Sequence, residues 1–372
     1  MTAAPPRIFL SAGEPSGDRH GSAVVSALRA RLPGAVIEAL GGPRIAAAGA
    51  TVRHPMERYT VLGFVEVLGK VPAHLRLLRT LEGDFRSGRY DLVLLIDYPG
   101  FHVRVAEAAH RHGVKVLYYI APQLWAWRPE RARRVAGAVD RMAVILPFEP
   151  AFFGRHGIRA EYVGHPLLDR EPLPSRDAAR AALGTAPGER LLGLFPGSRR
   201  QEVARLWPPF REAARRLRAE GRCDRVVVAG TREGEYPGAE GITVHRGPAE
   251  TVLAAADAAL AKSGTTTLEA ALADLPMVVA YRMHPFTSWI ARRVITVRWI
   301  SLVNLVAEQE VVQELIQRQV TPERLAGAVG PLLDRCDPKT RAQRDGLALV
   351  RERLGGSGAA ARVARIAAEL LA

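Results

Sequence analysis

Cysteine, lysine and long apolar runs are all scarce in this 372-residue sequence, and each shortage argues against a class of protein. The two cysteines, Cys223 and Cys336, have no cysteine or histidine near them at ligand spacing, which argues against a disulfide framework and a structural zinc site. No stretch reaches the roughly 18 uninterrupted apolar residues of a membrane span. Residues 1–10 also lack the basic start and apolar run of a signal peptide. We therefore expect a cytoplasmic protein in a reducing compartment.

Lysine is so rare that the positive charge of the chain is almost entirely arginine. The formal net charge is +14, yet the sequence contains only four lysines. Either an anionic partner or a general bias toward arginine and alanine explains such a balance. A nucleic-acid-binding protein would gather its basic residues around a recognisable reading motif, whereas these arginines are dispersed with acidic residues among most of them. We expect no nucleic acid partner, and charge alone identifies no other.

Apolar content is plentiful, and its arrangement predicts two similar domains. Hydrophobic residues make up 48% of a chain that is long for a single core. Short apolar runs separated by helical segments predict parallel strands covered on both faces. These runs lie at residues 7–12, 36–40, 92–96, 114–120, 142–146, 191–195, 226–229, 258–261 and 277–280.

A stretch rich in Pro, Gly and charged residues between 167 and 190 divides the two series of strands. The sequence thus predicts an α/β protein with two doubly wound parallel-sheet domains, at residues 1–167 and 168–344. The helical tail, residues 345–372, packs either back on the first domain or on a second subunit. Ligands of such sheets bind beyond the carboxyl ends of the strands, so the loops there are the places to search for chemistry.

Three loops of the first half carry candidate residues. Residues 13–18 offer glycines that let a ligand approach the backbone and polar side chains that either bind sugar hydroxyls or cap a helix. This loop lacks the G-x-G-x-x-G pattern, which argues against a dehydrogenase. Asp97 follows a very apolar strand and is either a helix cap or a general base. Residues 121–128 contain two tryptophans, suited equally to a sugar or acyl group and to core packing. The candidates that could bind a sugar or an acceptor are Gly13, Glu14, Ser16, Gly17, Gln123 and Trp125.

Two loops of the second half resemble anion sites. Residues 196–200 and 262–269 both lead from a strand through small residues into a helix, where free N–H groups favour a negative charge. Neither is a Walker A motif, because the Gly-Lys-Ser/Thr ending is missing. Two such turns in one domain predict a bound nucleoside diphosphate, with Arg199 on a phosphate and Glu269 on the ribose hydroxyls. The residues expected to bind it are Gly197, Ser198, Arg199, Ser263, Gly264, Thr265, Thr267 and Glu269.

Nine blocks of sequence, in order and in register, resemble the lipid-A-disaccharide synthase family. They lie within about residues 7–335, at 11–18, 96–101, 121–128, 147–149, 163–166, 196–199, 263–269, 277–282 and 301–305. The resemblance implies a GT-B glycosyltransferase, whose two Rossmann-like domains face each other across a cleft. It also implies transfer of 2,3-diacylglucosamine from UDP to 2,3-diacylglucosamine 1-phosphate (lipid X), with inversion, giving a β-1,6-linked disaccharide and UDP. No metal and no cofactor are implied.

The resemblance also assigns residues. Asp97 matches the proposed base, Arg199 and Glu269 match UDP-binding positions, and Gly247 lies in a loop expected at the uracil. Asn304 is expected on the donor side. The chain departs from the family pattern at His102, where many members carry Asn, and at Val303, where a Pro is usual. The alternative is another GT-B enzyme that uses UDP-N-acetylglucosamine, either a 2-epimerase or the transferase that makes a peptidoglycan lipid intermediate. The tryptophan block and the Asp97 loop favour the disaccharide synthase.

Acylated substrates imply contact with a membrane surface. Residues 61–81 mix an apolar stripe with basic residues, which suits a segment lying on an anionic leaflet, although core packing gives the same pattern. The candidates facing the membrane are Phe64, Val67 and Leu68, and residues 282–298 are a second candidate region. We expect a peripheral protein at the cytoplasmic face of the inner membrane, and an oligomer is compatible with the sequence.

Overall fold

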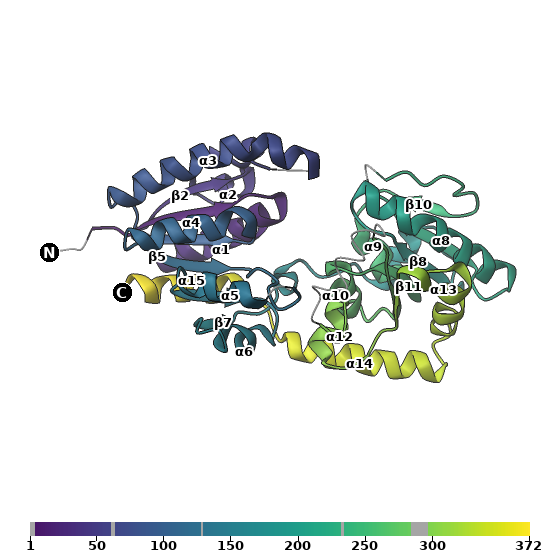
Figure 1. Cartoon of the computed structure of the whole chain (residues 1–372). Helices are drawn as coiled ribbons and strands as arrows, with labels where there is room; N and C mark the ends of the chain where they lie inside the picture. Colours follow the sequence, from purple (N-terminus) through teal and green to yellow (C-terminus); the bar gives the residue numbers. More distant parts are fainter. Residues whose placement is uncertain (1–3, 61–63, 128, 232–233, 284–296) are drawn as a thin grey trace. The chain divides into compact units, whose positions relative to one another are not determined.

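The computed structural model describes residues 4–60, 64–127, 129–231, 234–283 and 297–372, without the side chains of residues 64–68. The chain divides into two compact units (Figure 1). The first contains Met1–Arg170 and Gly356–Ala372, and the second contains Glu171–Gly355. The last helix of the chain therefore belongs to the unit that the chain builds first.

The described residues of the first unit form a seven-stranded parallel sheet with strand order β3-β2-β1-β4-β5-β6-β7. The central strands are wholly apolar or nearly so because helices cover both faces of a parallel sheet. The strands are β1 (Arg7–Ala12), β2 (Val36–Gly41), β3 (Thr51–Pro55), β4 (Leu92–Ile96), β5 (Lys115–Tyr119), β6 (Arg141–Val144) and β7 (Ala160–Tyr162). The helices are α1 (Pro15–Arg31), α2 (Pro43–Ala47), α3 (Phe64–Arg86), α4 (Pro99–Arg111), α5 (Ala132–Ala136), α6 (Glu149–Gly154) and α15 (Ala359–Leu371).

In the second unit, the described residues form a six-stranded parallel sheet with order β10-β9-β8-β11-β12-β13. The strands are β8 (Leu191–Phe195), β9 (Arg225–Ala229), β10 (Thr243–His245), β11 (Ala258–Lys262), β12 (Met277–Tyr281) and β13 (Glu314–Ile316). The helices are α7 (Arg176–Ala182), α8 (Arg200–Ala219), α9 (Ala249–Ala255), α10 (Thr265–Leu272), α12 (Leu302–Ala307), α13 (Pro322–Val329) and α14 (Pro338–Leu354). The predicted α/β class with two doubly wound sheets is confirmed.

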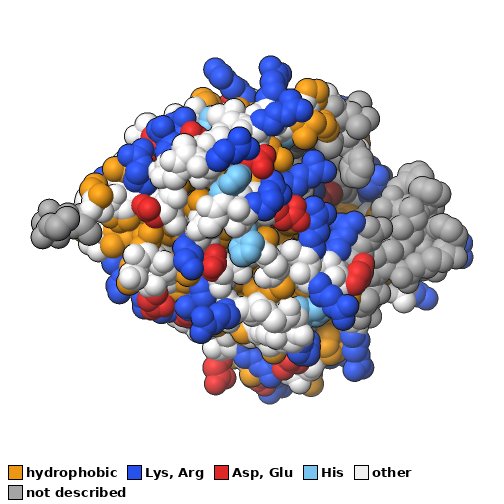
Figure 2. Space-filling model, turned by 60° about the vertical axis from the view of Figure 1, so that its left-hand side comes forward, with side chains coloured by type: hydrophobic (Ala, Val, Ile, Leu, Met, Phe, Trp, Pro, Cys, Tyr) orange, Lys and Arg blue, Asp and Glu red, His pale blue; other side chains and the backbone are white. Residues whose placement is uncertain are grey.

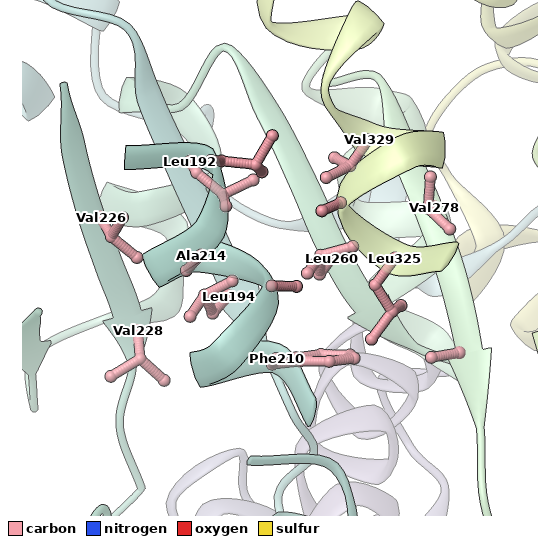
Figure 3. Close-up of a cluster of buried hydrophobic side chains, with 14 of the residues drawn as sticks. Leu192, Leu194, Phe210, Ala214, Val226, Val228, Leu260, Val278, Leu325 and Val329 are labelled. Atoms are coloured by element: carbon pink, nitrogen blue, oxygen red, sulfur yellow. The ribbon is translucent and has the colours of Figure 1, made fainter. Parts of the chain in front are cut away.

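Each unit has its own apolar core. In the first, side chains of β1, β4 and β5 pack with α1 and with Val363 and Ile366 of α15, which lies against α1. In the second, Leu192, Leu194 and Leu260 of the sheet meet Phe210 of α8 and Leu325 of α13 (Figure 3). Every one of these side chains is fully buried, so each unit can hold a rigid strand-end loop.

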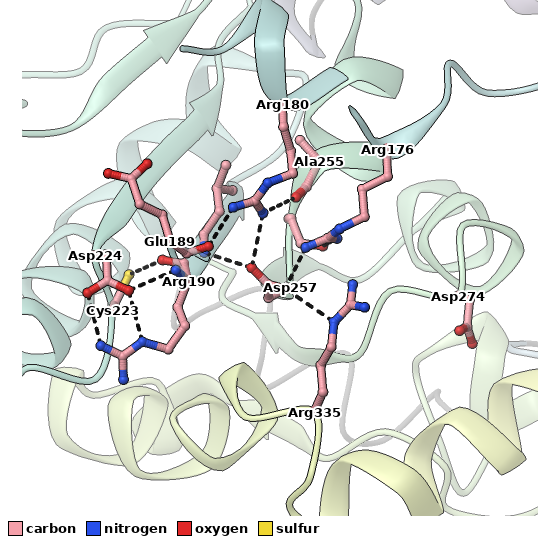
Figure 4. Close-up of polar contacts among 12 residues, drawn as sticks. Arg176, Arg180, Glu189, Arg190, Cys223, Asp224, Ala255, Asp257, Asp274 and Arg335 are labelled. Atoms are coloured by element: carbon pink, nitrogen blue, oxygen red, sulfur yellow. Dashed lines mark hydrogen bonds and ion pairs between the residues drawn. The ribbon is translucent and has the colours of Figure 1, made fainter. Parts of the chain in front are cut away.

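A buried carboxylate ties α7 to the sheet of the second unit. Asp257, 6% exposed, pairs with Arg176 at 2.6 Å, Arg180 at 3.4 Å and Arg335 at 3.5 Å, and accepts a hydrogen bond from the backbone N–H of Leu191 at 2.9 Å (Figure 4). These groups lie at the start of β8 and β11. They anchor the amino-terminal ends of these strands, whereas the candidate loops lie at the carboxyl ends.

The surface is basic but mixed. Figure 2 shows Lys and Arg side chains spread among acidic, apolar and neutral ones over the face that it draws, rather than collected in one stripe. Within the described part of the chain, no helix is both long enough and apolar enough to cross a bilayer.

Candidate active site

The loops after β1 and β4 meet at the carboxyl edge of the first sheet. Ala12 pairs with Ile96, so the residues that follow these two strands are neighbours. Gly13 is buried, and a Cβ atom there would lie 2.5 Å from the ring of Tyr98, which leaves room for glycine alone. Two of the three loops predicted to carry chemistry in this half are therefore brought together here.

Asp97 stands at this edge in a conformation that few residues adopt. Its φ is 51° and that of Tyr98 is 52°, both in the left-handed region that disfavours side chains with a Cβ atom. Burial, and after it the negative charge of Glu14, raises the pKa of Asp97 above its ordinary value. Glu14 is half-buried at the start of α1, so two carboxylates act on one another at the edge of the sheet.

Tyr98 lies in a cluster of aromatic rings beside Asp97. Its hydroxyl is 2.7 Å from Nε2 of His74, a residue of α3, and it donates to the carbonyl of Tyr59 at 3.3 Å. Phe101 also packs on His74, with ring centroids 5.2 Å apart. His74 was not predictable as a partner of this loop, since nothing in the sequence spacing shows that α3 crosses it.

The rest of the first loop divides between structural and exposed residues. Asp18 is 2% exposed and accepts hydrogen bonds from the backbone N–H groups of Gly42, Arg44 and Ile45 at 2.8–3.1 Å. It is thus a helix cap, for α2 rather than for its own helix. Gly17 is buried, and Ser16 is exposed.

The two tryptophans of the third loop differ sharply in exposure. Trp125 is 8% exposed, packs edge-on against Phe148 and donates from Nε1 to Oε1 of Glu149 at 3.0 Å. Trp127 is 58% exposed, and Gln123 is exposed as well. Core packing thus accounts for Trp125, and Trp127 is the indole available to a ligand.

Glu149, the partner of Trp125, is a buried carboxylate. It is 1% exposed and also accepts hydrogen bonds from the backbone N–H groups of Ile145 at 3.1 Å and Leu146 at 2.9 Å. Burial raises the pKa of Glu149 to about 7, against the opposing effect of these three donors.

In the second unit, the loop after β8 wraps around a carboxylate of its own helix. The Oε2 atom of Glu202 accepts hydrogen bonds from the N–H groups of Ser198 at 3.1 Å and Arg199 at 3.3 Å. Gly197 has a φ of 122°, and a Cβ atom there would lie 2.6 Å from Glu202. Glu202 thus caps the N-terminus of its own helix α8, where a negative charge is favourable.

The loop after β11 lies next to it because β8 and β11 pair, with Phe195 opposite Ala261. Lys262 bridges the two loops, with its Nζ atom 3.0 Å from Oε1 of Glu202. The hydroxyl of Ser263 donates to the carbonyl of Ile300 at 2.7 Å, and the hydroxyl of Thr267 donates to the carbonyl of Gly264 at 2.8 Å. Thr265 is exposed, and Glu269 is half-buried. The two loops predicted to bind an anion are thus adjacent and joined by an ion pair.

Asn304 is placed where a ligand cannot use its amide. The side chain is fully buried, Nδ2 donates to the carbonyl of Val312 and to Glu314, and Oδ1 accepts from the N–H groups of Val311 and Val312. Both donor hydrogens and both lone pairs are therefore engaged within the protein. This residue holds the turn before β13.

Gly247 follows β10, which is separated from β8 by β9. A Cβ atom at Gly247 would lie 2.7 Å from Nε2 of His245, so the close approach of this ring requires glycine. Within the described residues, no group of three or more His, Cys, Asp or Glu is arranged to hold a metal ion.

The candidate membrane segment is described only in part. Phe64, Val67 and Leu68 have side chains outside the described residues, and most of the second candidate region, residues 284–296, lies outside them as well. Further along α3, Val71 is 40% exposed and Leu75 is 38% exposed, and the exposed side chains of Arg76 and Arg79 follow on the same helix.

Comparison with known proteins gives a single family. The model of the family described as lipid-A-disaccharide synthetase matches residues 8–361. Lipid-A-disaccharide synthase of Geobacter sulfurreducens is 42% identical over 98% of this chain and 97% of its own length. The enzyme of the same name from Myxococcus xanthus is 41% identical over 99% and 98%.

Solved structures with the same fold are far less similar in sequence. A putative UDP-N-acetylglucosamine 2-epimerase from Listeria monocytogenes superposes with a TM-score of 0.65 at 12% identity, over 97% of this chain and 95% of that one. The glycotransferase of kitacinnamycin gives a TM-score of 0.65 at 19% identity over the whole of both chains. These likenesses show the fold alone.

Proposed function

The chain belongs to the lipid-A-disaccharide synthase family, which makes it a glycosyltransferase of lipid A biosynthesis with the GT-B fold, and from this premise we propose how its residues act. The proposed reaction transfers 2,3-diacylglucosamine from its UDP donor to a hydroxyl of 2,3-diacylglucosamine 1-phosphate. The products are the β-1,6-linked disaccharide 1-phosphate and UDP.

Asp97 is the proposed general base. Inversion requires the acceptor hydroxyl to attack the anomeric carbon from the face opposite UDP, and the proton of that hydroxyl passes to the Asp97 carboxylate. The observation that carries the proposal is the placement of Asp97 at a strand end, half-buried and with a raised pKa, which makes it a better proton acceptor than an exposed aspartate. General base catalysis of this kind typically contributes about 10²–10⁴ in rate.

The loops after β8 and β11 are the proposed site for the diphosphate of UDP. Arg199 offers a forked donor, which stabilises the negative charge of the leaving group. The N–H groups of Ser198 and Arg199 become available to the phosphates only when they release Glu202. Lys262 adds a cation bridging both loops, 3.0 Å from Glu202. Glu269 is the proposed partner of the ribose hydroxyls, and Gly247 lies in the loop proposed for the uracil.

The first unit is the proposed binding site for the acceptor, with Glu14, Ser16, Gln123 and Trp127 as its polar and aromatic contacts. Its exposed α3 face is the proposed contact with the inner leaflet. Val71 and Leu75 present apolar area, and Arg76 and Arg79 present charge, which contributes about 1 kcal/mol per residue near an anionic leaflet.

Sedimentation with anionic vesicles tests the membrane contact. The double variant Val71→Ser/Leu75→Ser is expected to lose most of its vesicle binding, and the exposed pair Arg216→Ser/Arg218→Ser on α8 serves as the control. Unchanged sedimentation of the α3 variant would assign this face to solvent.

Release of UDP in the presence of both substrates tests the reaction. We expect release only when the UDP-linked donor and the diacylglucosamine 1-phosphate acceptor are both present. The Asp97→Asn variant keeps the size of the side chain and removes the base, so its turnover should fall by about 10²–10⁴ while UDP affinity is retained. Turnover near that of the unmodified protein would refute the assignment of Asp97.

A further inference from the structure

A chain of buried hydrogen bonds ends on the backbone of Asp97. Oγ of Ser11 is 2.7 Å from Nε2 of His102, and Nδ1 of His102 is 2.7 Å from the carbonyl oxygen of Asp97. The hydroxyl of Tyr118 donates to the same carbonyl at 2.8 Å. Ser11, His102 and Tyr118 are all fully buried. Three elements, β1, α4 and β5, thus converge on one peptide group.

The partners of His102 determine its tautomer. A carbonyl oxygen can only accept, so Nδ1 must carry the proton and donate to Asp97. The Nε2 atom of the neutral ring then accepts from the hydroxyl of Ser11. Burial lowers the pKa of His102 to about 3, so the ring is neutral near pH 7. The carbonyl of Asp97 excludes the other neutral tautomer, because an Nε2–H ring would present a bare Nδ1 lone pair to it.

The peptide held in this way is a strained one. It joins Asp97 to Tyr98, both with φ near 50° in the left-handed region, and each such residue costs on the order of 1–3 kcal/mol unless its surroundings fix it. On the other side of the Asp97 Cα atom, the N–H group donates to the carbonyl of Tyr119 at 3.0 Å. With the peptide groups on both sides fixed, the direction of the Cα–Cβ bond of Asp97 is fixed too.

We propose that His102, which is bonded to Ser11 and donates from Nδ1 to the Asp97 carbonyl, is a positioning residue that fixes the direction of the Asp97 carboxylate. This inference deepens the proposed function and rests on Asp97 being the base. Tyr118 is the second donor and shares the task. The other groups that act on Asp97 are Glu14, through its charge, and the N–H group of Tyr98. His102 and Tyr118 bond to the carbonyl of Asp97 and not to its carboxylate, so their effect on turnover passes through geometry.

The decisive comparison is between His102→Ala, which removes the donor, and His102→Asn, which keeps a side-chain N–H on a non-titrating group. We expect His102→Ala to lower kcat by about 10- to 100-fold, the usual cost of a reacting group displaced by about 1 Å, with KM for both substrates unchanged within about twofold. The asparagine variant is expected to recover most of the lost kcat. The acid limb of the kcat–pH profile, which reports Asp97, should move in the alanine variant and return in the asparagine variant.

A matched control is His156→Ala, at the end of α6. That ring also bonds from Nδ1 to a carbonyl of its own helix, that of Phe152, at 2.9 Å, but it lies away from β4. Its loss should change stability only. If His102→Ala fails to fold, Ser11→Ala and Tyr118→Phe take its place, since each removes one hydroxyl. Both should lower kcat several-fold without changing KM.

The outcomes separate two failures. If Asp97→Asn is inactive while folded His102→Ala, or both hydroxyl variants, keep the kcat and pH profile of the unmodified protein, the positioning role is wrong and the base stands. The positioning role is also wrong if His102→Asn restores the melting temperature without restoring kcat. If Asp97→Asn itself turns over normally, the proposed function fails first. A ¹⁵N spectrum of the His102 ring checks the Nδ1–H tautomer without any assay, and an Nε2–H ring overturns the inference.

Discussion

Glu149 in the first unit and Asp257 in the second are both buried carboxylates next to strand ends, and their partners differ in kind. Glu149 accepts three hydrogen bonds, from the indole of Trp125 and from two backbone N–H groups. Asp257 lies among three arginines, Arg176, Arg180 and Arg335 (Figure 4). The same chemical group is therefore held by dipoles in one unit and by full charges in the other.

The same contrast recurs at the two candidate loops. The carbonyl of Asp97 is held by the uncharged donors of His102 and Tyr118, whereas the loop after β8 is held by the Glu202–Lys262 ion pair. Neutral donors fix the orientation of the Asp97 peptide without attracting ions, and such an arrangement suits a residue that accepts a proton. Charged groups attract a phosphate and can exchange partners when it arrives. The way each loop is held thus matches the task proposed for it.

The largest expected effect comes from removing the charge of Asp257. In Asp257→Asn, Arg180 stays buried but loses its negatively charged partner. Breaking a buried ion pair in this way typically costs about 3–5 kcal/mol of stability. Urea unfolding measures the loss. The control is Asp224→Asn, whose pair with Arg190 is about 40% exposed and should contribute less than about 1 kcal/mol. Equal losses of unfolding free energy in the two variants would contradict the expectation that burial makes the Asp257 pair the stronger one.

Glu149→Gln should show a stability difference that depends on pH. The pKa of Glu149 is raised to about 7, so the folded state holds a proton that the unfolded chain releases above about 4.5. As the pH rises from about 4.5 to about 7, the free energy of unfolding of the unmodified protein should therefore fall relative to that of the variant. The fall is at most about 3 kcal/mol, at 1.36 kcal/mol per pKa unit. Melting temperatures at pH 5 and pH 8 test this. The exposed Glu352→Gln serves as the control. A constant difference for Glu149→Gln would show that its three donors keep the group ionised.

Arg199→Ala should weaken UDP binding by about 10- to 100-fold, since a hydrogen bond to a charged group contributes about 1.5–3 kcal/mol. Calorimetric titration with UDP measures this, and Arg216→Ala, on the exposed far part of α8, is the matched control. An unchanged affinity in Arg199→Ala would remove this arginine from the proposed diphosphate site.

The smallest effect is expected for Lys262→Met. Its pair with Glu202 is about a quarter exposed, so the free energy of unfolding should fall by about 1 kcal/mol or less. The loss should shrink at high salt, because ions screen the pair. A loss in Lys262→Met that is the same at 50 mM and 1 M salt would contradict the charged character of this loop.

Most of the fold was predictable because the central strands are continuous apolar runs. β1, β4, β8, β9, β11 and β12 all lie within or next to the predicted runs. The sequence did not predict the outermost strands of the two sheets, which have only three to five residues each. These strands are β3, β7, β10 and β13. Ala160–Tyr162 and Thr243–His245 are too short for a periodicity to show, and only pairing with a neighbour makes them strands.

The candidate loops were predictable for a different reason, namely that parallel strands end at one edge. The loops after β1 and β4, and those after β8 and β11, are brought together as the strand pattern implied. The partners within those loops were not predictable. Asn304 is engaged by a segment seven to ten residues away, and His102 by a serine 91 positions away in the chain. Such bonds depend on how the helices lie on the sheet, and a single sequence does not encode that in any local pattern.

The helix α15 has a consequence for how the protein is made. Its side chains Val363 and Ile366 complete the apolar core of the first unit, although the whole second unit precedes them in the chain. During synthesis, the first unit must wait with its α1 face uncovered until the second has left the ribosome. The apolar core beside the sheet that carries Asp97 is therefore completed only after the second unit has been synthesised.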